Sequence, residues 1–179
     1  ARGRRSVTHP LSQACGRGDA CARHDLRVFR APWTPVRALR LTGLVTITTA
    51  EIASQPETWR RGLAEAERHR ALVPEPGEST LYIGCGTSAF VAHAIATLCE
   101  SAGLGPTDWA FASELPSRRY DRVVALSRSG TTTEVLDALR GPLAGAHRVM
   151  VTGAPEEVPD GVADTQVALE FADERSVVQ

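Results

Sequence analysis

The spacing of apolar residues divides the chain at about residue 45. Over residues 1–44 no period of two or 3.6 residues is sustained, and three prolines interrupt any regular element. From about 49 to 72 the spacing becomes helical, with one face formed by Ile52, Trp59, Leu63 and Ala66. We expect this helix to restart at Ser54, because Pro56 and Glu57 suit a first helical turn.

Beyond residue 77, short apolar runs alternate with helical stretches. The runs predict five strands, at 80–83, 109–112, 121–126, 147–151 and 166–169. Two helices are expected between them: one at 88–101, with Val91, Ile95 and Leu98 facing inward, and one at 131–140, with Val135, Leu136 and Leu139 inward. Strands and helices that alternate with short connections predict an α/β fold, a three-layer α/β/α sandwich around a five-stranded parallel sheet of the flavodoxin-like kind.

Composition and charge agree with one globular domain that carries an extension. The chain has 179 residues, 42% of them apolar and 23% charged, and a net charge near −1. Residues 1–44 hold nine arginines against two aspartates, so we expect a disordered basic extension there and a folded domain over 45–179. A further hypothesis is that the natural protein starts at Val45, read from an internal GTG codon, and that residues 1–44 are translated upstream sequence.

Several classes of partner and compartment are disfavoured by the same composition. No apolar run approaches the roughly 20 residues of a membrane-spanning helix, and the near-zero net charge argues against nucleic acid as a partner. The four cysteines show no framework spacing, which favours reduced thiols and a cytoplasmic location. Lysine is absent, which excludes a P-loop nucleotide site. No metal or nucleotide cofactor is implied.

Two loops that join a strand to a helix carry the candidate chemistry. The first contains Gly86, Thr87 and Ser88, and the second is formed by Ser127, Arg128, Ser129, Gly130, Thr131 and Thr132. In a parallel sheet such loops meet at the carboxyl edge, where ligands bind. Backbone amides at helix starts, hydroxyl donors and the guanidinium of Arg128 suit a phosphate. Together they predict a site for a small polyol phosphate.

Two other interpretations compete at these loops. Serine, threonine and glycine also serve as ordinary helix caps and turn residues, which is the commoner use of either loop alone. The stretch from Gly84 to Ala89 also fits the short form of a dinucleotide-binding fingerprint, with Glu114 as a ribose ligand. Cys85 could be a reactive thiol at a helix start, but a small residue that fits its place is the commoner reading.

The two loops, from Gly84 to Ser88 and from Ser127 to Thr132, together resemble the SIS (sugar isomerase) domain. That family includes the isomerase half of glutamine–fructose-6-phosphate aminotransferase, fructosamine deglycases and the AgaS-type ketose/aldose isomerases. Glu51-Ile52 with Gln55-Pro56 is similar to the helix that precedes the first SIS domain of such enzymes. Residues 173–179 are similar to the segment that closes it. The resemblance covers about 45–179 and implies the first domain of a tandem pair, truncated at Gln179.

The resemblance implies a role for each loop residue. Ser88, Ser127, Ser129 and Thr132 would hold the sugar phosphate, with Gly86 and Gly130 shaping the loops. Thr87 and the backbone near Val177 would contact the sugar. Arg128 stands where the aminotransferase often has glutamine. The family's general base lies in the second domain, which this sequence lacks, and Glu174 is a weak local candidate.

The resemblance also implies the class of reaction and the assembly. The parent protein would be an isomerase, deaminase or deglycase of sugar phosphates in carbohydrate derivative metabolism, working as a homodimer, while this part alone would bind without turnover. The alternative from another class is a sugar-phosphate sensor without catalysis, and a dinucleotide-binding Rossmann domain is the third.

Overall fold

The computed structural model describes residues 46–69, 74–172 and 175. The boundary expected near residue 45 and the hypothetical start at Val45 lie outside these residues, as do the site candidates Glu174 and Val177. The domain division therefore stays a prediction.

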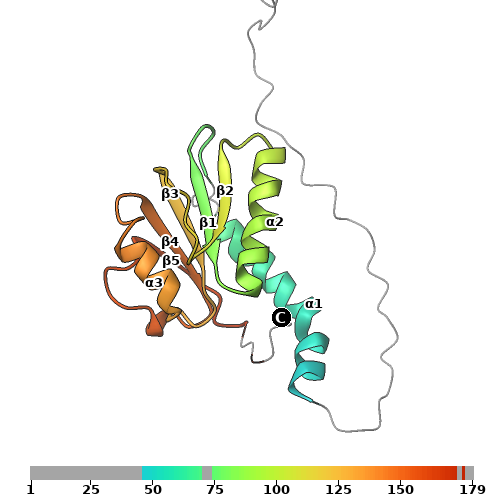
Figure 1. The fold of residues 1–179 in the computed structure, drawn as a ribbon. Helices are drawn as coiled ribbons and strands as arrows, with labels where there is room; N and C mark the ends of the chain where they lie inside the picture. Colours follow the sequence, from blue (N-terminus) through green and yellow to red (C-terminus); the bar gives the residue numbers. More distant parts are fainter. Residues whose placement is uncertain (1–45, 70–73, 173–174, 176–179) are drawn as a thin grey trace, which may run out of the picture. The chain divides into compact units, whose positions relative to one another are not determined.

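A five-stranded parallel sheet forms the centre of the described domain (Figure 1). The strands are β1 (Thr80–Gly84), β2 (Thr107–Phe111), β3 (Arg122–Leu126), β4 (His147–Thr152) and β5 (Thr165–Ala168). Their spatial order is β2-β1-β3-β4-β5, and every neighbouring pair is parallel. All five predicted strands are thus present, with ends shifted by at most two residues. The order is the flavodoxin-like one, in which the winding direction reverses between β1 and β3.

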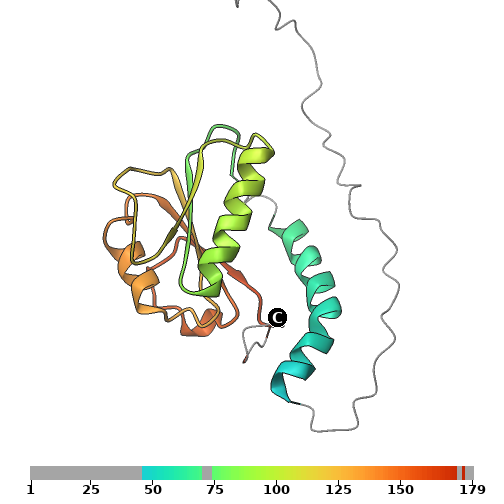
Figure 2. The ribbon, with the colours of Figure 1, turned by 45° about the vertical axis from the view of Figure 1, so that its right-hand side comes forward.

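Helices cover both faces of the sheet, as Figure 2 shows. Helix α2 (Thr87–Ser101) packs on the face that presents Tyr82, Val124 and Val149. Helix α3 (Thr133–Arg140) packs on the other face. The larger of the two core clusters lies there, and its sheet residues include Leu81, Ile83, Val123, Ala125 and Met150. The predicted three-layer sandwich is therefore confirmed.

The two sheet-covering helices differ in how well the apolar pattern predicted their inner face. In α3 the residues expected to face inward, Val135, Leu136 and Leu139, are buried. In α2 the prediction was wrong for Val91 and Leu98, which are exposed, whereas Ile95 is partly buried and packs against the core. The buried residues are Ala89, Ala92 and Ala96, because alanines let the helix lie close to the sheet.

Helix α1 (Ile47–Arg68) also departs from the prediction. It is one continuous helix that starts at the N-cap Thr46, so the expected restart at Ser54 is wrong and Pro56 lies inside the helix. The hydroxyl of Ser54 donates to the carbonyl of Glu51 at 2.7 Å instead of capping a new helix. The predicted apolar face of this helix is exposed at Ile52, Trp59, Leu63 and Ala66.

None of the described helices is both long enough and apolar enough to cross a membrane.

Candidate functional site

The two predicted loops lie at the same edge of the sheet. Strands β1 and β3 are neighbours, and Gly84 at the end of β1 is in register with Leu126 at the end of β3. The loops that follow these strands therefore start side by side at the carboxyl edge. This is also the point where the strand order reverses, which is the usual ligand position in open α/β sheets.

The first loop makes a tight turn from β1 into α2. A Cβ atom at Gly84 would lie 2.7 Å from the carbonyl carbon of Ser88 and 2.8 Å from the amide nitrogen of Ala89, so the helix start approaches the strand closely. Gly86 has φ +53°, a backbone conformation that favours glycine. The side chains of Thr87 and Ser88 make no hydrogen bond to any other described residue. Their hydroxyls are thus available at the helix start.

The second loop brings its hydroxyl groups together. Ser127 is buried, and its Oγ lies 2.9 Å from Oγ1 of Thr132. The Oγ of Ser129 accepts from the amide and from the hydroxyl of Thr131, at 3.3 and 3.2 Å. Gly130 has φ +69°, and a Cβ there would lie 2.6 Å from Cγ2 of Val158. The tight turn between Ser127 and Thr132 therefore depends on glycine.

The fourth strand supports this second loop. The carbonyl of Arg128 accepts from the amide of Gly153 at 2.9 Å and from the hydroxyl of Thr152 at 3.1 Å. These bonds fix the loop backbone, while the Arg128 side chain is exposed and forms no ion pair with another described residue. Thr152 and Gly153 were not predicted as part of the site. The signal was present, since they follow the fourth strand at the same edge of the sheet.

Helix capping does not explain the hydroxyl groups. Gly86 is the N-cap of α2 and Thr132 that of α3, and neither helix has a side-chain cap hydrogen bond. In contrast, the Oγ1 of Thr46 accepts from the amide of Thr49 and caps α1. The hydroxyl of Thr132 faces Ser127 across the loop instead. Side-chain capping therefore does not account for these hydroxyls, while the Ser129 hydroxyl accepts from the Thr131 amide as a turn residue does.

Cys85 behaves as a core residue. Its side chain packs against the larger core cluster. Burial is the main cause that raises the pKa of its thiol, and the charge of Glu134 adds to the effect. A raised pKa keeps the thiol protonated at neutral pH, which is the opposite of an activated nucleophile.

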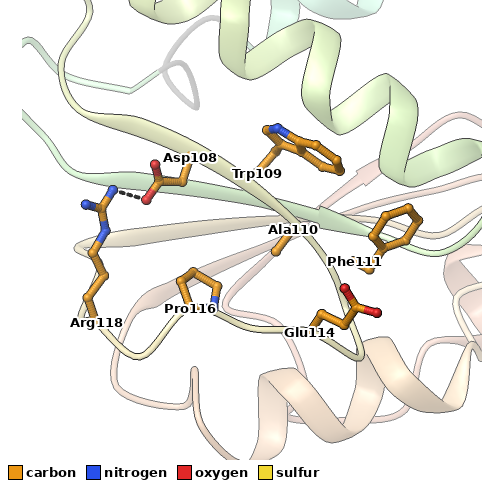
Figure 3. Close-up of a pocket in the computed structure, with 7 residues that line it drawn as sticks. All are labelled: Asp108, Trp109, Ala110, Phe111, Glu114, Pro116 and Arg118. Atoms are coloured by element: carbon orange, nitrogen blue, oxygen red, sulfur yellow. Dashed lines mark hydrogen bonds and ion pairs between the residues drawn. The ribbon is translucent and has the colours of Figure 1, made fainter.

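Two cavities in the described residues lie away from the two loops. One of about 470 Å³ lies along the outer edge of β2 and is lined by Asp108, Trp109, Ala110, Phe111, Glu114, Pro116 and Arg118 (Figure 3). Glu114 thus lines this open surface beyond the end of β2. None of the predicted loop residues lines the cavity. The features that mark the two-loop edge as a candidate site are its hydroxyl groups and glycines.

The three histidines in the described residues lie outside the two loops. The ring of His93 stacks on Trp109 with centroids 4.4 Å apart, on the outer side of α2 and β2. His147 begins β4, at the end of the sheet opposite the two loops, and His69 forms the C-cap of α1. The described residues contain no group of three or more metal-ligating side chains.

Comparisons with known proteins identify the fold. No family model matches the sequence, and no curated protein matches it. Solved structures do match. The C-terminal domain of glucosamine-fructose-6-phosphate aminotransferase from Francisella tularensis matches with a TM-score of 0.62 and 19% identity, over 74% of this chain and 41% of that one.

Two further structures give the same result. Tagatose-6-phosphate ketose/aldose isomerase from Escherichia coli matches with a TM-score of 0.55 and 21% identity, over 69% of this chain and 40% of that one. Glucosamine-6-phosphate deaminase from Thermotoga maritima matches with a TM-score of 0.55 and 22% identity, over 70% and 40% of the two chains. The match spans about two fifths of the length of each of these three proteins. The domain therefore has the fold of the sugar isomerase domain.

Proposed function

We propose that residues 45–179 form a phosphosugar-binding domain of an enzyme that isomerises, deaminates or deglycates a sugar phosphate. One observation carries the proposal: two loops rich in glycine and hydroxyl groups, from Gly84 to Ser88 and from Ser127 to Thr132, start side by side at the switch point of the sheet. Three structures of the same fold are named as a tagatose-6-phosphate isomerase, a domain of a glucosamine-fructose-6-phosphate aminotransferase and a glucosamine-6-phosphate deaminase.

In this proposal the loops bind and orient the substrate. The phosphate lies between the start of α2 and the second loop, where it accepts hydrogen bonds from backbone amides at the helix starts and from four hydroxyl groups, those of Ser88, Ser127, Ser129 and Thr132. Arg128 adds a charge-assisted bond. Fixing the phosphate places the carbon beside the carbonyl or imine for proton removal, which is the step that such reactions share. The base for that step is not assigned among the described residues, and Glu174 stays the weak candidate.

The strand order argues against a dinucleotide at the first loop. A dinucleotide-binding fold has the order 3-2-1-4-5-6, so that its second strand lies between the first and the third. Here β1 lies between β2 and β3. The dinucleotide reading also leaves the hydroxyl groups of Ser127, Ser129 and Thr132 without a role.

We also propose that the protein is a cytoplasmic homodimer. The observation behind the dimer is the set of large apolar side chains that α1 and α2 expose, namely Ile47, Ile52, Trp59, Leu63, Phe90, Val91 and Leu98. Large apolar side chains gathered on exposed helices are typical of interfaces. We expect sedimentation velocity to give the mass of a dimer, and Leu98→Asp to shift the distribution toward the monomer. A wild-type monomer at micromolar concentration would contradict this part.

The test of binding is calorimetric titration of the full chain with fructose 6-phosphate, with glucosamine 6-phosphate and with NAD. We expect saturable binding of a sugar phosphate, weakened in Ser127→Ala and in Ser129→Ala by about 1–2 kcal/mol for each lost hydrogen bond. Ser117→Ala is the matched control, because Ser117 is exposed in the turn that precedes β3. Unchanged affinity in both loop variants would remove the second loop from the site. Binding of NAD alone would overturn the proposal.

A further inference from the structure

Glu51 is buried on a helix that is otherwise largely exposed. It is the one buried residue of α1, with 5% of its surface exposed. A carboxylate in such a place needs hydrogen-bond donors, because an ionised group loses its hydration on burial. One donor is the backbone amide of Arg175, whose nitrogen lies 2.6 Å from Oε1 of Glu51. This short bond to a charged acceptor joins residues that are 124 positions apart.

A second contact ties the same helix to the same C-terminal segment. The guanidinium of Arg61 lies over the ring of Phe171, 4.4 Å from its centroid. Arg61 and Glu51 are ten positions apart on α1, so the helix contacts the C-terminal part of the chain at two described residues, Phe171 and Arg175. The cation–π contact is exposed on the arginine side, and the Glu51 bond is the buried one.

The other end of this segment lies against the candidate site. The amide of Leu169 donates to the carbonyl of Thr152 at 2.7 Å, and the amide of Ala172 donates to the carbonyl of Leu169 at 2.8 Å. A Cβ atom at Gly153 would lie 3.4 Å from both the carbonyl oxygen of Ala172 and that of Arg128. Ala172 and Arg128 therefore both lie beside Gly153, so the C-terminal residues and the second loop meet at this point.

We propose that Glu51 is a positioning residue of the phosphosugar site, a role that rests on the proposed function. Its carboxylate anchors Arg175, Leu169 donates to the carbonyl of Thr152, and the amide of Gly153 donates to the carbonyl of Arg128. The second loop is thus pre-organised for the phosphate by a residue that does not touch the ligand. Without the carboxylate the segment loses its buried anchor, and part of the binding free energy is spent on ordering the loop.

The test is titration of the full chain with fructose 6-phosphate and with glucosamine 6-phosphate, in wild type and in variants of this contact. Loss of one hydrogen bond to a charged acceptor predicts roughly 10- to 100-fold weaker binding in Glu51→Ala. Glu51→Gln keeps an acceptor oxygen of the same reach, and we expect it to restore the affinity to within about threefold of wild type. Glu57→Ala is the matched control, since Glu57 is on the same helix, exposed and paired with Arg60.

A second variant approaches the contact from the other side. Arg175→Pro removes the amide that donates to Glu51 and leaves α1 unchanged. We expect it to weaken binding, and the loss in the double variant to be smaller than the sum of the two single losses, because both changes remove the hydrogen bond between Glu51 and the Arg175 amide. If Glu51→Ala does not fold, Arg175→Pro decides the matter.

The outcomes are separable. Wild-type affinity in a folded Glu51→Ala overturns the positioning role and leaves the proposed function intact. Equal losses in Glu51→Ala and Glu51→Gln, with lowered thermal midpoints in both, overturn it in favour of a purely structural role. If wild type binds neither sugar phosphate, the proposed function fails and the positioning role falls with it.

Discussion

Gly130→Ala tests whether the second loop has the shape described here. The glycine has φ +69°, and an alanine Cβ there would lie 2.6 Å from Cγ2 of Val158, 3.2 Å from Oγ1 of Thr152 and 3.3 Å from the carbonyl of Ala154. The left-handed backbone costs an alanine about 1–2 kcal/mol. Overpacking against Val158, a buried residue, adds about 1–3 kcal/mol. We therefore expect the free energy of unfolding to fall by about 2–5 kcal/mol.

The assay is urea denaturation of the full chain followed by circular dichroism. Gly161→Ala is the matched control, because Gly161 has φ +71° but no atom within 4 Å of its added Cβ. It carries the backbone cost alone, so its free energy should fall by about 1–2 kcal/mol. Adding Val158→Ala to Gly130→Ala removes the clashing methyl group and should relieve the overpacking, although the Val158 truncation has its own cost. The two changes should therefore be non-additive.

Two results would refute this reasoning. If Gly130→Ala is as stable as wild type, then the loop does not hold the left-handed turn beside Val158. If Gly130→Ala and Gly161→Ala lose the same free energy, then the turn is correct but the close packing is not. Either result would also contradict the described contact between the Ser127 and Thr132 hydroxyls, because that contact depends on the turn.

Two further predictions concern the rest of the fold. Asp164 accepts hydrogen bonds from the guanidinium and the backbone amide of Arg148, which lower the pKa of its carboxyl to about 2. The resulting stabilisation is present above the unfolded-state pKa near 3.9 and is lost as the pH falls toward 2. In urea denaturation, Asp164→Asn should therefore lower the free energy of unfolding by up to about 1 kcal/mol at pH 7 and by almost nothing near pH 2. Equal costs at the two pH values would contradict it. Gly62 lies inside α1 with no atom within 4 Å of an added Cβ; Gly62→Ala should therefore stabilise the helix by about 0.5–1 kcal/mol, and a lowered thermal midpoint would count against a helical Gly62.

The sequence alone determined the order of strands and helices and the place of the candidate loops. Apolar runs such as 121–126 mark buried parallel strands, since both faces of such strands are covered. Glycine and hydroxyl residues directly after two of those runs mark candidate ligand loops, because parallel strands bring their carboxyl ends to one edge. The face of α3 was also readable, since Val135, Leu136 and Leu139 are its bulky apolar residues and all are buried.

Only the tertiary structure decided which faces of α1 and α2 are buried and what supports the site. The helical period of α2 is compatible with Val91 and Leu98 facing the sheet, but both are exposed. The residues buried against the sheet are alanines, because the helix lies close to it. In α1 the buried residue is the carboxylate of Glu51, because a backbone amide 124 positions away donates to it. Local periodicity reports which side chains share a face, and it carries no information on a partner that distant in the chain. That contact exists only once the strands have assembled. The same holds for the approach of Ala172 and Arg128 to Gly153.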